Sequence, residues 1–132
     1  MKVFLDTNVL VSAVATRGLC ADVLRELLRR HHLVISPELL TELDNVFRKV
    51  LGLPQNIIFE FIEVIKQDSQ LSTPSPLLNL KIRDRDDLLM LSSALNGGAD
   101  FFITGDKELL ELQNIRSMDI VSPRMFWERL KA

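Results

Sequence analysis

The chain has 132 residues, a length that suits one domain with a single sizeable hydrophobic core. Its apolar fraction of 47% lies near the upper end for soluble proteins, and its net charge of −2 excludes a protein that holds nucleic acid through an overall positive charge. The single cysteine, Cys20, excludes an intrachain disulfide and fits a reducing compartment, where we expect it to be packed rather than reactive.

Positive charge is nevertheless concentrated at two places in the sequence. One group consists of Arg25, Arg29, Arg30, His31 and His32, and the other of Lys81, Arg83 and Arg85. Charge runs of this kind usually form a solvated helix face or a solvated loop, which is the simpler interpretation of both.

The N-terminal segment imitates a signal peptide, because Lys2 is followed by apolar residues. Asp6 and Asn8 interrupt that stretch, and a charge inside the apolar region argues against export. No apolar run approaches the roughly 20 residues that span a bilayer. We therefore expect a cytoplasmic protein without a membrane segment.

The first third of the chain alternates strands and helices. A short apolar strand is predicted over residues 2–5, followed by a helix over 8–15 that breaks at Arg17-Gly18. A second helix is predicted over 21–30, and a second buried strand over 33–35.

The middle of the chain is mainly helical. Ser36-Pro37 supplies an N-cap and a proline at the first helical position, and the apolar spacing that follows continues to Val50. Another amphipathic helix covers 57–65, a strand end with a loop covers 72–76, and a further helix covers 86–97.

The last third of the chain repeats the alternation. A strand is predicted over 101–103, a short helix over 107–112, a strand ending at 120–121 and a C-terminal helix capped by Ser122-Pro123. Strands alternating with helices indicate a parallel sheet, and right-handed crossovers place every strand-to-helix turn at one edge of it. Residues 1–132 should form one domain.

Two aspartates occupy that edge. Asp6 closes the first strand, and Asp106 follows the strand at 101–103. Ligands of open α/β sheets bind at the carboxyl ends of the strands, where the strand order reverses. Carboxylates gathered there repel one another unless a cation is bound, so the pattern favours a site for a hard metal ion.

Other acidic residues could join the same site. Glu42 lies beside the apolar stripe of its helix, although such a residue is often only solvated. Asp86 and Asp87 begin a helix; Asp86 is the better candidate for its cap, Asp87 points along the buried face, and Asp84 would stay outside the direct ligands.

Each strand-end aspartate also has a purely structural interpretation. Asp6 could cap the first helix, although Thr7 and Asn8 could fill that role, and Asp106 could cap the helix at 107–112. Thr104 could donate a hydrogen bond to a bound phosphate or water.

The acidic residues stand in motifs that resemble those of PIN-domain nucleases. Residues 3–10 (VFLDTNVL) resemble the opening of that family, and 36–43 (SPELLTEL) its glutamate helix. The segment 83–87 (RDRDD) resembles its third acidic motif, with Arg85 where relatives often have proline, and 98–110 (GADFFITGDKELL) resembles the last motif of one subfamily. The likeness covers nearly the whole chain.

The resemblance implies a PIN-like α/β/α sandwich, with a central parallel sheet of about five short strands, and a Mg²⁺- or Mn²⁺-dependent endoribonuclease. Members of the subfamily are described as toxins of type II toxin–antitoxin pairs, so the implied partners are RNA, an antitoxin protein and a second copy in a homodimer. The implied acidic residues are Asp6, Glu42, Asp87 and Asp106, with Asp6, Asp87 and Asp106 as metal ligands. Supporting polar residues would be Asn8, Thr104, Asp86 and Asp84, and the RNA backbone would be held by Arg83, Arg85, Lys107 and Arg17.

Two other classes remain open at this stage. A haloacid-dehalogenase-like phosphatase also opens with an aspartate at a strand end, but it needs a second acid at position 8, which is Asn. A receiver domain is matched only in part. A PIN-like module that binds RNA or protein without cutting would keep the same motifs. The sequence does not specify the RNA target, the number of metal ions or the dimer interface.

Overall fold

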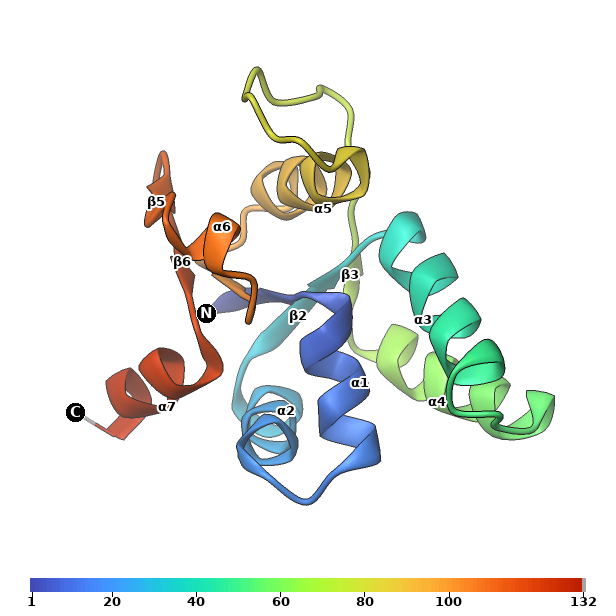
Figure 1. The fold of residues 1–132 in the computed structure, drawn as a ribbon. Helices are drawn as coiled ribbons and strands as arrows, with labels where there is room; N and C mark the ends of the chain where they lie inside the picture. The colour runs from blue at the N-terminus through green and yellow to red at the C-terminus, as the bar shows by residue number, and fades with distance from the viewer. Residues whose placement is uncertain (132) are drawn as a thin grey trace.

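The structure is a computed structural model and describes residues 1–131. One sheet has the strand order β3-β2-β1-β4-β6-β5 (Figure 1). The strands are β1 (Lys2–Leu5), β2 (His32–Ile35), β3 (Gln70–Leu71), β4 (Phe101–Ile103), β5 (Asn114–Ile115) and β6 (Met118–Val121). Neighbouring strands are parallel in the part of the sheet made of β3, β2, β1, β4 and β6. At its edge, β5 pairs with β6 as an antiparallel hairpin. The α/β fold with a parallel sheet is confirmed, and the hairpin strand β5 is an addition that the sequence did not predict.

Helices cover both faces of this sheet. Their bounds are α1 (Thr7–Ala15), α2 (Leu19–Arg30), α3 (Pro37–Lys49), α4 (Gln55–Gln67), α5 (Arg85–Asn96), α6 (Lys107–Leu110) and α7 (Pro123–Lys131). In Figure 1, α5 lies on one side of the sheet and α1, α2 and α7 lie on the other, while α3 and α4 connect β2 to β3. The predicted helices are all present, and their ends differ from the prediction by one or two residues.

The core lies where the two central strands meet the helices. Phe4 of β1 and Phe102 of β4 are fully buried, and their rings stack with centroids 5.2 Å apart. On α3 the side chain of Ser36 accepts a hydrogen bond from the Leu39 amide, and Pro37 occupies the first turn, as predicted. Among residues 1–131 no single helix is both long and apolar enough to cross a membrane; α1 and α2 pass that test only as a pair bent by 103°.

The strand order reverses between β1 and β4. From β1 the chain builds outward through β2 to β3, and it then returns to place β4 and β6 on the other side of β1. Leu5 at the end of β1 is level with Ile103 at the end of β4, and the Asp6 amide donates to the Ile103 carbonyl at 2.9 Å. The fold therefore opens a ligand-binding position directly beside Asp6.

Candidate active site

The two strand-end aspartates are linked through one threonine. The Thr104 hydroxyl is fully buried; it donates to Asp6 Oδ2 at 2.8 Å and accepts from the Asp106 amide at 3.0 Å. The structure therefore brings Asp6 and Asp106 together, as the sequence predicted. Thr104 itself differs from the prediction, because its hydrogen is used by Asp6 and is not free for a phosphate or water.

Each of these aspartates also caps a helix. Asp6 Oδ1 accepts from the Thr7 amide at 2.7 Å at the start of α1, and Asp106 Oδ1 accepts from the Glu108 amide at 2.9 Å at the start of α6. The expectation that Thr7 or Asn8 would cap α1 in place of Asp6 is thus wrong. Capping thus holds one oxygen of each carboxylate, and the Thr104 hydroxyl holds the second oxygen of Asp6.

The first turn of α5 brings Asp87 to the same place. Asp84, not Asp86, is the N-cap of α5: its Oδ1 accepts from the Asp86 amide at 2.8 Å and from the Asp87 amide at 3.3 Å. Asp84 and Asp86 are exposed, whereas Asp87 is half-buried. The prediction that Asp86 would cap the helix is corrected, because a cap lies one residue before the first helical turn and α5 begins at Arg85.

Glu42 enters the site from α3. It is half-buried, next to a stripe of Leu39, Leu43 and Phe47 that faces the core. The side chain of Thr7 lies near this carboxylate and lowers its pKa, while the Thr7 hydroxyl donates to Met90 Sδ at 3.9 Å. Sequence reasoning assigned Thr7 only a possible capping role, and its burial beside the site became visible only in the structure.

We call Asp6, Glu42, Asp84, Asp87 and Asp106 the acidic cluster. The pKa of Asp87 is raised to about 7, first by burial and then by the charges of Asp84, Asp6, Asp106 and Glu42. Burial likewise raises the pKa of Asp6, although hydrogen bonds from Thr104 and from the Thr7 amide oppose it. These shifts show that the carboxylates are close enough to repel one another.

Glu42 titrates within the same field. Burial is the main cause that raises its pKa, the nearby Thr7 side chain lowers it, and the charges of Asp6, Asp86 and Asp84 raise it. Asp86 thus stands near Glu42 at the outer margin, while Asp87 interacts with every other member of the acidic cluster. Of the two neighbouring aspartates, Asp87 is the one that faces the strand ends.

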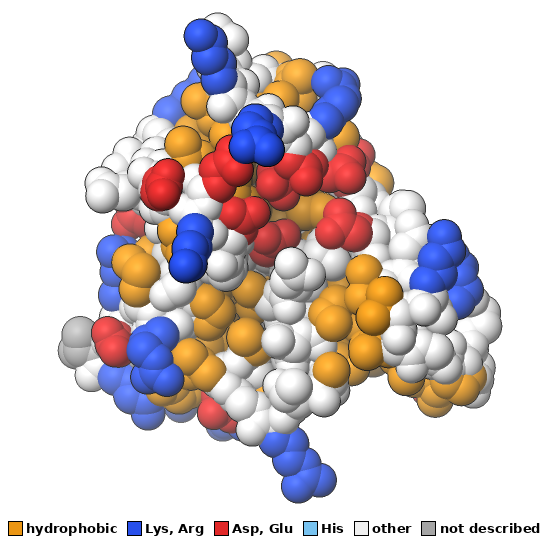
Figure 2. All heavy atoms as spheres, in the orientation of Figure 1, with side chains coloured by type: hydrophobic (Ala, Val, Ile, Leu, Met, Phe, Trp, Pro, Cys, Tyr) orange, Lys and Arg blue, Asp and Glu red, His pale blue; other side chains and the backbone are white. Residues whose placement is uncertain are grey.

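No basic side chain of residues 1–131 forms an ion pair with the acidic cluster. Figure 2 shows acidic side chains gathered in one patch between α6, α3 and the start of α5, with Lys and Arg side chains at its margin. Carboxylate oxygens are the ligands that Mg²⁺ and Mn²⁺ prefer, so the donor set fits such an ion. Within the described residues no three acids, histidines or cysteines are yet grouped closely enough to hold one ion.

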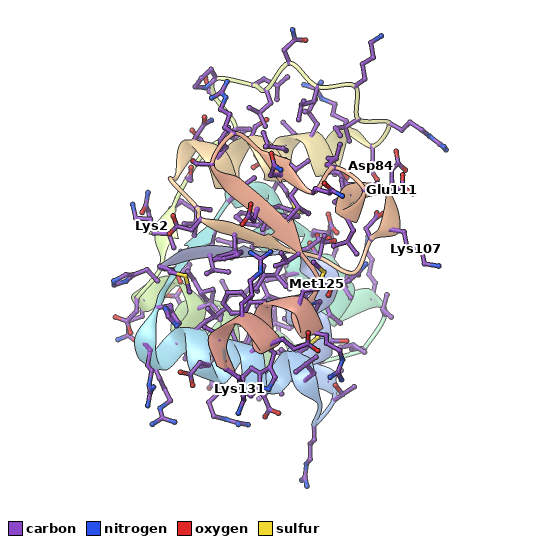
Figure 3. The ribbon with its side chains drawn as sticks, turned by 90° about the vertical axis from the view of Figure 1, so that its left-hand side faces the viewer. Lys2, Asp84, Lys107, Glu111, Met125 and Lys131 are labelled. Atoms are coloured by element: carbon purple, nitrogen blue, oxygen red, sulfur yellow. The ribbon has the colours of Figure 1, made fainter. Side chains whose placement is uncertain are left out.

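The predicted RNA-binding cations differ in position. Arg83 and Arg85 flank Asp84, and Lys107 is the first residue of α6, so all three lie exposed at the margin of the acidic cluster. In Figure 3, Lys107 points outward on the side of the molecule where Asp84 lies. Arg17 is wrong as a member of this group, because it follows α1, whose nine residues span about 13 Å and carry the chain away from Asp6.

With this geometry in place, comparison with known proteins identifies the family. The sequence profile of the PIN domain matches residues 2–108, most of the chain. The chain belongs to the PIN-domain family. No curated protein sequence matches it. Among solved structures, it is similar to a chain from the crystal structure of VapBC2 from Rickettsia felis bound to a DNA fragment from their promoter.

That likeness concerns the PIN fold. The TM-score is 0.66 and the sequences are 19% identical, with 92% of this chain and 98% of that chain covered. The match covers a larger share of the chain than residues 2–108, the part that the PIN-domain profile covers. The sheet order and the flanking helices are therefore those of a PIN domain along nearly the whole chain.

Proposed function

We propose that this PIN domain is a Mg²⁺- or Mn²⁺-dependent ribonuclease that hydrolyses RNA phosphodiester bonds. The observation that carries the proposal is the acidic cluster itself. Its carboxylates come from the ends of β1 and β4, from α3 and from α5. Their charges help to raise the pKa values of Asp6, Glu42 and Asp87. No basic side chain among residues 1–131 forms an ion pair with them.

The residues have distinct parts in this mechanism. Asp6, Asp87 and Asp106 would hold the metal; when bound, such an ion activates water and offsets negative charge on the phosphate. Thr104 holds Asp6 in position through its 2.8 Å hydrogen bond. Glu42, half-buried on α3, would orient the attacking water and accept its proton as the bond from phosphorus to the leaving oxygen breaks.

The surrounding cations would hold the RNA chain. Arg83, Arg85 and Lys107 are exposed around the acidic cluster, where phosphates on either side of the cleaved bond would pass. Because this contact is electrostatic, binding should weaken as the salt concentration rises. Without a metal ion the carboxylates repel the phosphates, so RNA binding at the acidic cluster, as well as turnover, should depend on the metal.

The test is cleavage of single-stranded RNA with Mn²⁺, with and without EDTA. Asp6→Asn and Asp106→Asn should abolish cleavage, and Glu42→Gln should reduce it strongly. Asp44→Asn is the matched control, because Asp44 lies on the same helix as Glu42 and pairs only with Arg48, at 3.0 Å, among the described residues. Cleavage that survives EDTA or both aspartate substitutions would refute the proposal. Metal binding without cleavage would identify a non-catalytic binding module instead.

The phosphatase alternative has little support. Asn8 lies exposed in the first turn of α1, and the acid that such an enzyme needs at this position is absent. Release of phosphate from small monoesters without RNA cleavage is the result that would revive it.

We also propose that the protein is the toxin of a toxin–antitoxin pair. Membership of the PIN family and the similarity to a chain of the VapBC2 complex support this. Co-expression with the product of the adjacent gene should suppress growth arrest, and arrest that persists with every neighbouring product would contradict it.

A homodimer is the proposed assembly. Exposed apolar side chains support it: Val50 is 73% exposed, Phe59 61% and Leu71 56%. Such side chains gain stability when a second surface covers them. Light scattering should give twice the mass of the chain, and a monomer at high concentration would exclude this assembly.

A further inference from the structure

A groove lies between α2 and α7, apart from the acidic cluster. It has a volume of about 360 Å³ and is lined by Glu26, Arg30, Trp127, Leu130 and Lys131. We call it the α2–α7 groove. Trp127 is the only tryptophan of the chain, and Leu130 extends the apolar surface beside it. None of these residues belongs to the acidic cluster, so the groove is a separate feature of the surface.

The α2–α7 groove is positively charged. Lys131 Nζ lies 4.8 Å from the centroid of the Trp127 ring and forms no ion pair within residues 1–131. Arg30 Nε lies 3.4 Å from Glu26 Oε1, and 69% of the arginine side chain remains exposed, so this pair is only weakly held. Arg29 adds an exposed cation to the same turn of α2.

Further positive groups stand behind this turn. Burial lowers the pKa of His31, and the amino group of Met1 lowers it further. The charges of Arg30 and His32 also lower this pKa, whereas the charge of Glu26 raises it. The amino terminus, the last turn of α2 and the start of β2 therefore meet at one place. The basic residues that stood out in the sequence are thus joined by Lys131 from the other end of the chain.

The groove lies at the edge of the sheet opposite the acidic cluster. Arg30 ends α2 just before β2 begins, and α7 starts after β6 and runs back toward the amino ends of the strands, with Lys131 in its last turn. Figure 2 shows Lys and Arg side chains gathered over α7, away from the acidic patch. The four residues of β1 alone separate the two edges by about 13 Å.

We propose that the α2–α7 groove is a second RNA-binding site, in which a base stacks on Trp127 and the adjacent phosphates contact Lys131 and Arg30. The inference rests on the proposed ribonuclease activity for its biological meaning, since it would hold the part of the RNA that extends beyond the cleaved bond. A flat aromatic ring beside two cations is the combination that binds single-stranded nucleic acid.

The same chemistry favours RNA over an acidic peptide. Carboxylates of a peptide would contact Lys131 and Arg30, but they offer no flat ring to cover Trp127 and Leu130. A nucleotide supplies both the ring and the negative charge in one unit. An RNA that touches both sites must cover at least the length of β1 that separates them, about 13 Å.

The intrinsic fluorescence of Trp127 provides a direct test, because the chain contains one tryptophan and no tyrosine. A single-stranded RNA of about 12 nucleotides, titrated in EDTA at low salt, should change this fluorescence in a saturable way. An acidic peptide of equal charge should not. Saturated RNA binding, shown by anisotropy of labelled RNA, without a change in Trp127 would overturn the proposal.

Substitutions provide the second readout. Lys131→Gln should weaken binding of this RNA and reduce the slope of log affinity against log salt by about 0.7, the value for one phosphate contact on a single strand. Trp127→Phe retains a ring and should bind better than Trp127→Leu, which should lose about tenfold. Lys49→Gln removes an exposed lysine at the end of α3 and is the matched control. Equal effects of Lys131→Gln and Lys49→Gln would overturn the proposal.

The outcomes for the two sites are separable. If RNA is cleaved but the fluorescence of Trp127 does not change, RNA binding in the α2–α7 groove is refuted and the proposed ribonuclease activity is supported. If the fluorescence of Trp127 changes with RNA but no metal-dependent cleavage occurs, RNA binding in the groove is supported and the proposed ribonuclease activity is refuted. Lys131→Gln should raise KM for an RNA of about 12 nucleotides and leave kcat unchanged, because the groove does not contact the reacting atoms.

Discussion

Thr104→Val tests whether the buried hydroxyl organises the acidic cluster. Valine has nearly the shape of threonine, so the substitution removes the hydroxyl with little change in volume. Two hydrogen bonds are lost, the one to Asp6 Oδ2 at 2.8 Å and the one from the Asp106 amide at 3.0 Å. The side chain at 104 is fully buried, so water does not readily replace either bond.

The expected loss of stability follows from the charge of Asp6. A hydrogen bond to a charged group contributes about 1.5–3 kcal/mol and one between neutral groups about 1 kcal/mol, so the free energy of unfolding should fall by about 3 kcal/mol when Asp6 is ionised. With Asp6 protonated both lost bonds are neutral, and the loss should be about 2 kcal/mol.

The stability of the folded protein depends on pH through the pKa of Asp6. Burial raises that pKa above its ordinary value of 3.8, so the folded state retains a proton that the unfolded state has already released. Stability is therefore greatest below the unfolded pKa and falls as the pH rises through the folded pKa. Thr104 limits this fall, because its hydrogen bond lowers the pKa of Asp6. Removing Thr104 should make the fall steeper.

The assay is urea unfolding in EDTA at about pH 4 and about pH 8, with the slope of the transition as a check on two-state behaviour. Ser93→Ala is the matched control, since the Ser93 hydroxyl is buried and has no hydrogen-bond partner among residues 1–131. It should change stability little at either pH. A Thr104→Val effect no larger than that of Ser93→Ala, or one that does not grow with pH, would refute the reasoning.

Three further predictions concern the same carboxylates. In EDTA, Asp87→Asn should raise Tm at about pH 8 and leave it nearly unchanged at about pH 4. The wild type loses stability as the pH rises from 3.8, the ordinary pKa of an aspartate, through about 7, the pKa of Asp87 in the folded state. An unchanged Tm at both pH values would contradict the raised pKa. Mn²⁺ should raise Tm of the wild type but not of Asp6→Asn, as a thermal scan with and without EDTA would show. Asp84→Ala removes the N-cap of α5 and should lower the free energy of unfolding by about 1 kcal/mol, whereas Asp86→Ala should lower it much less. If urea unfolding shows the larger loss for Asp86→Ala, the cap is at Asp86.

The sequence predicted the fold where the pattern was periodic. Strands over 2–5 and 101–103 and the helix after Ser36-Pro37 have continuous apolar runs or clear caps, and the structure places them as predicted. The hairpin strand β5 was missed because Asn114–Ile115 is too short for a pattern, and its pairing depends on β6 beside it. Such a strand exists through tertiary contact and not through its own residues.

The candidate site was predictable to a similar extent. Asp6 and Asp106 follow from strand topology, because neighbouring parallel strands end at one edge. The roles of Asp84 and Asp86 were interchanged because caps depend on the helix start, and sequence patterns place that start only within a residue or two. The position of Thr7 near Glu42 depends on the packing of α1 against α3, so no local pattern specifies it.

The helix caps explain how the fold keeps repelling carboxylates at one point. Asp6, Asp84 and Asp106 each direct one oxygen to backbone amides at a helix start, where the partial positive charge of the helix favours an anion. This stabilisation comes from the local chain and requires no cation. Asp87, in contrast, caps nothing, and its pKa is the one raised to about 7. The electrostatic strain of the acidic cluster is thus concentrated on Asp87, the carboxylate whose ionisation a bound divalent ion would favour most strongly. Because Asp87 is about half protonated at pH 7, metal binding at that pH should release about half a proton from it, which isothermal titration in buffers of different ionisation enthalpy would count.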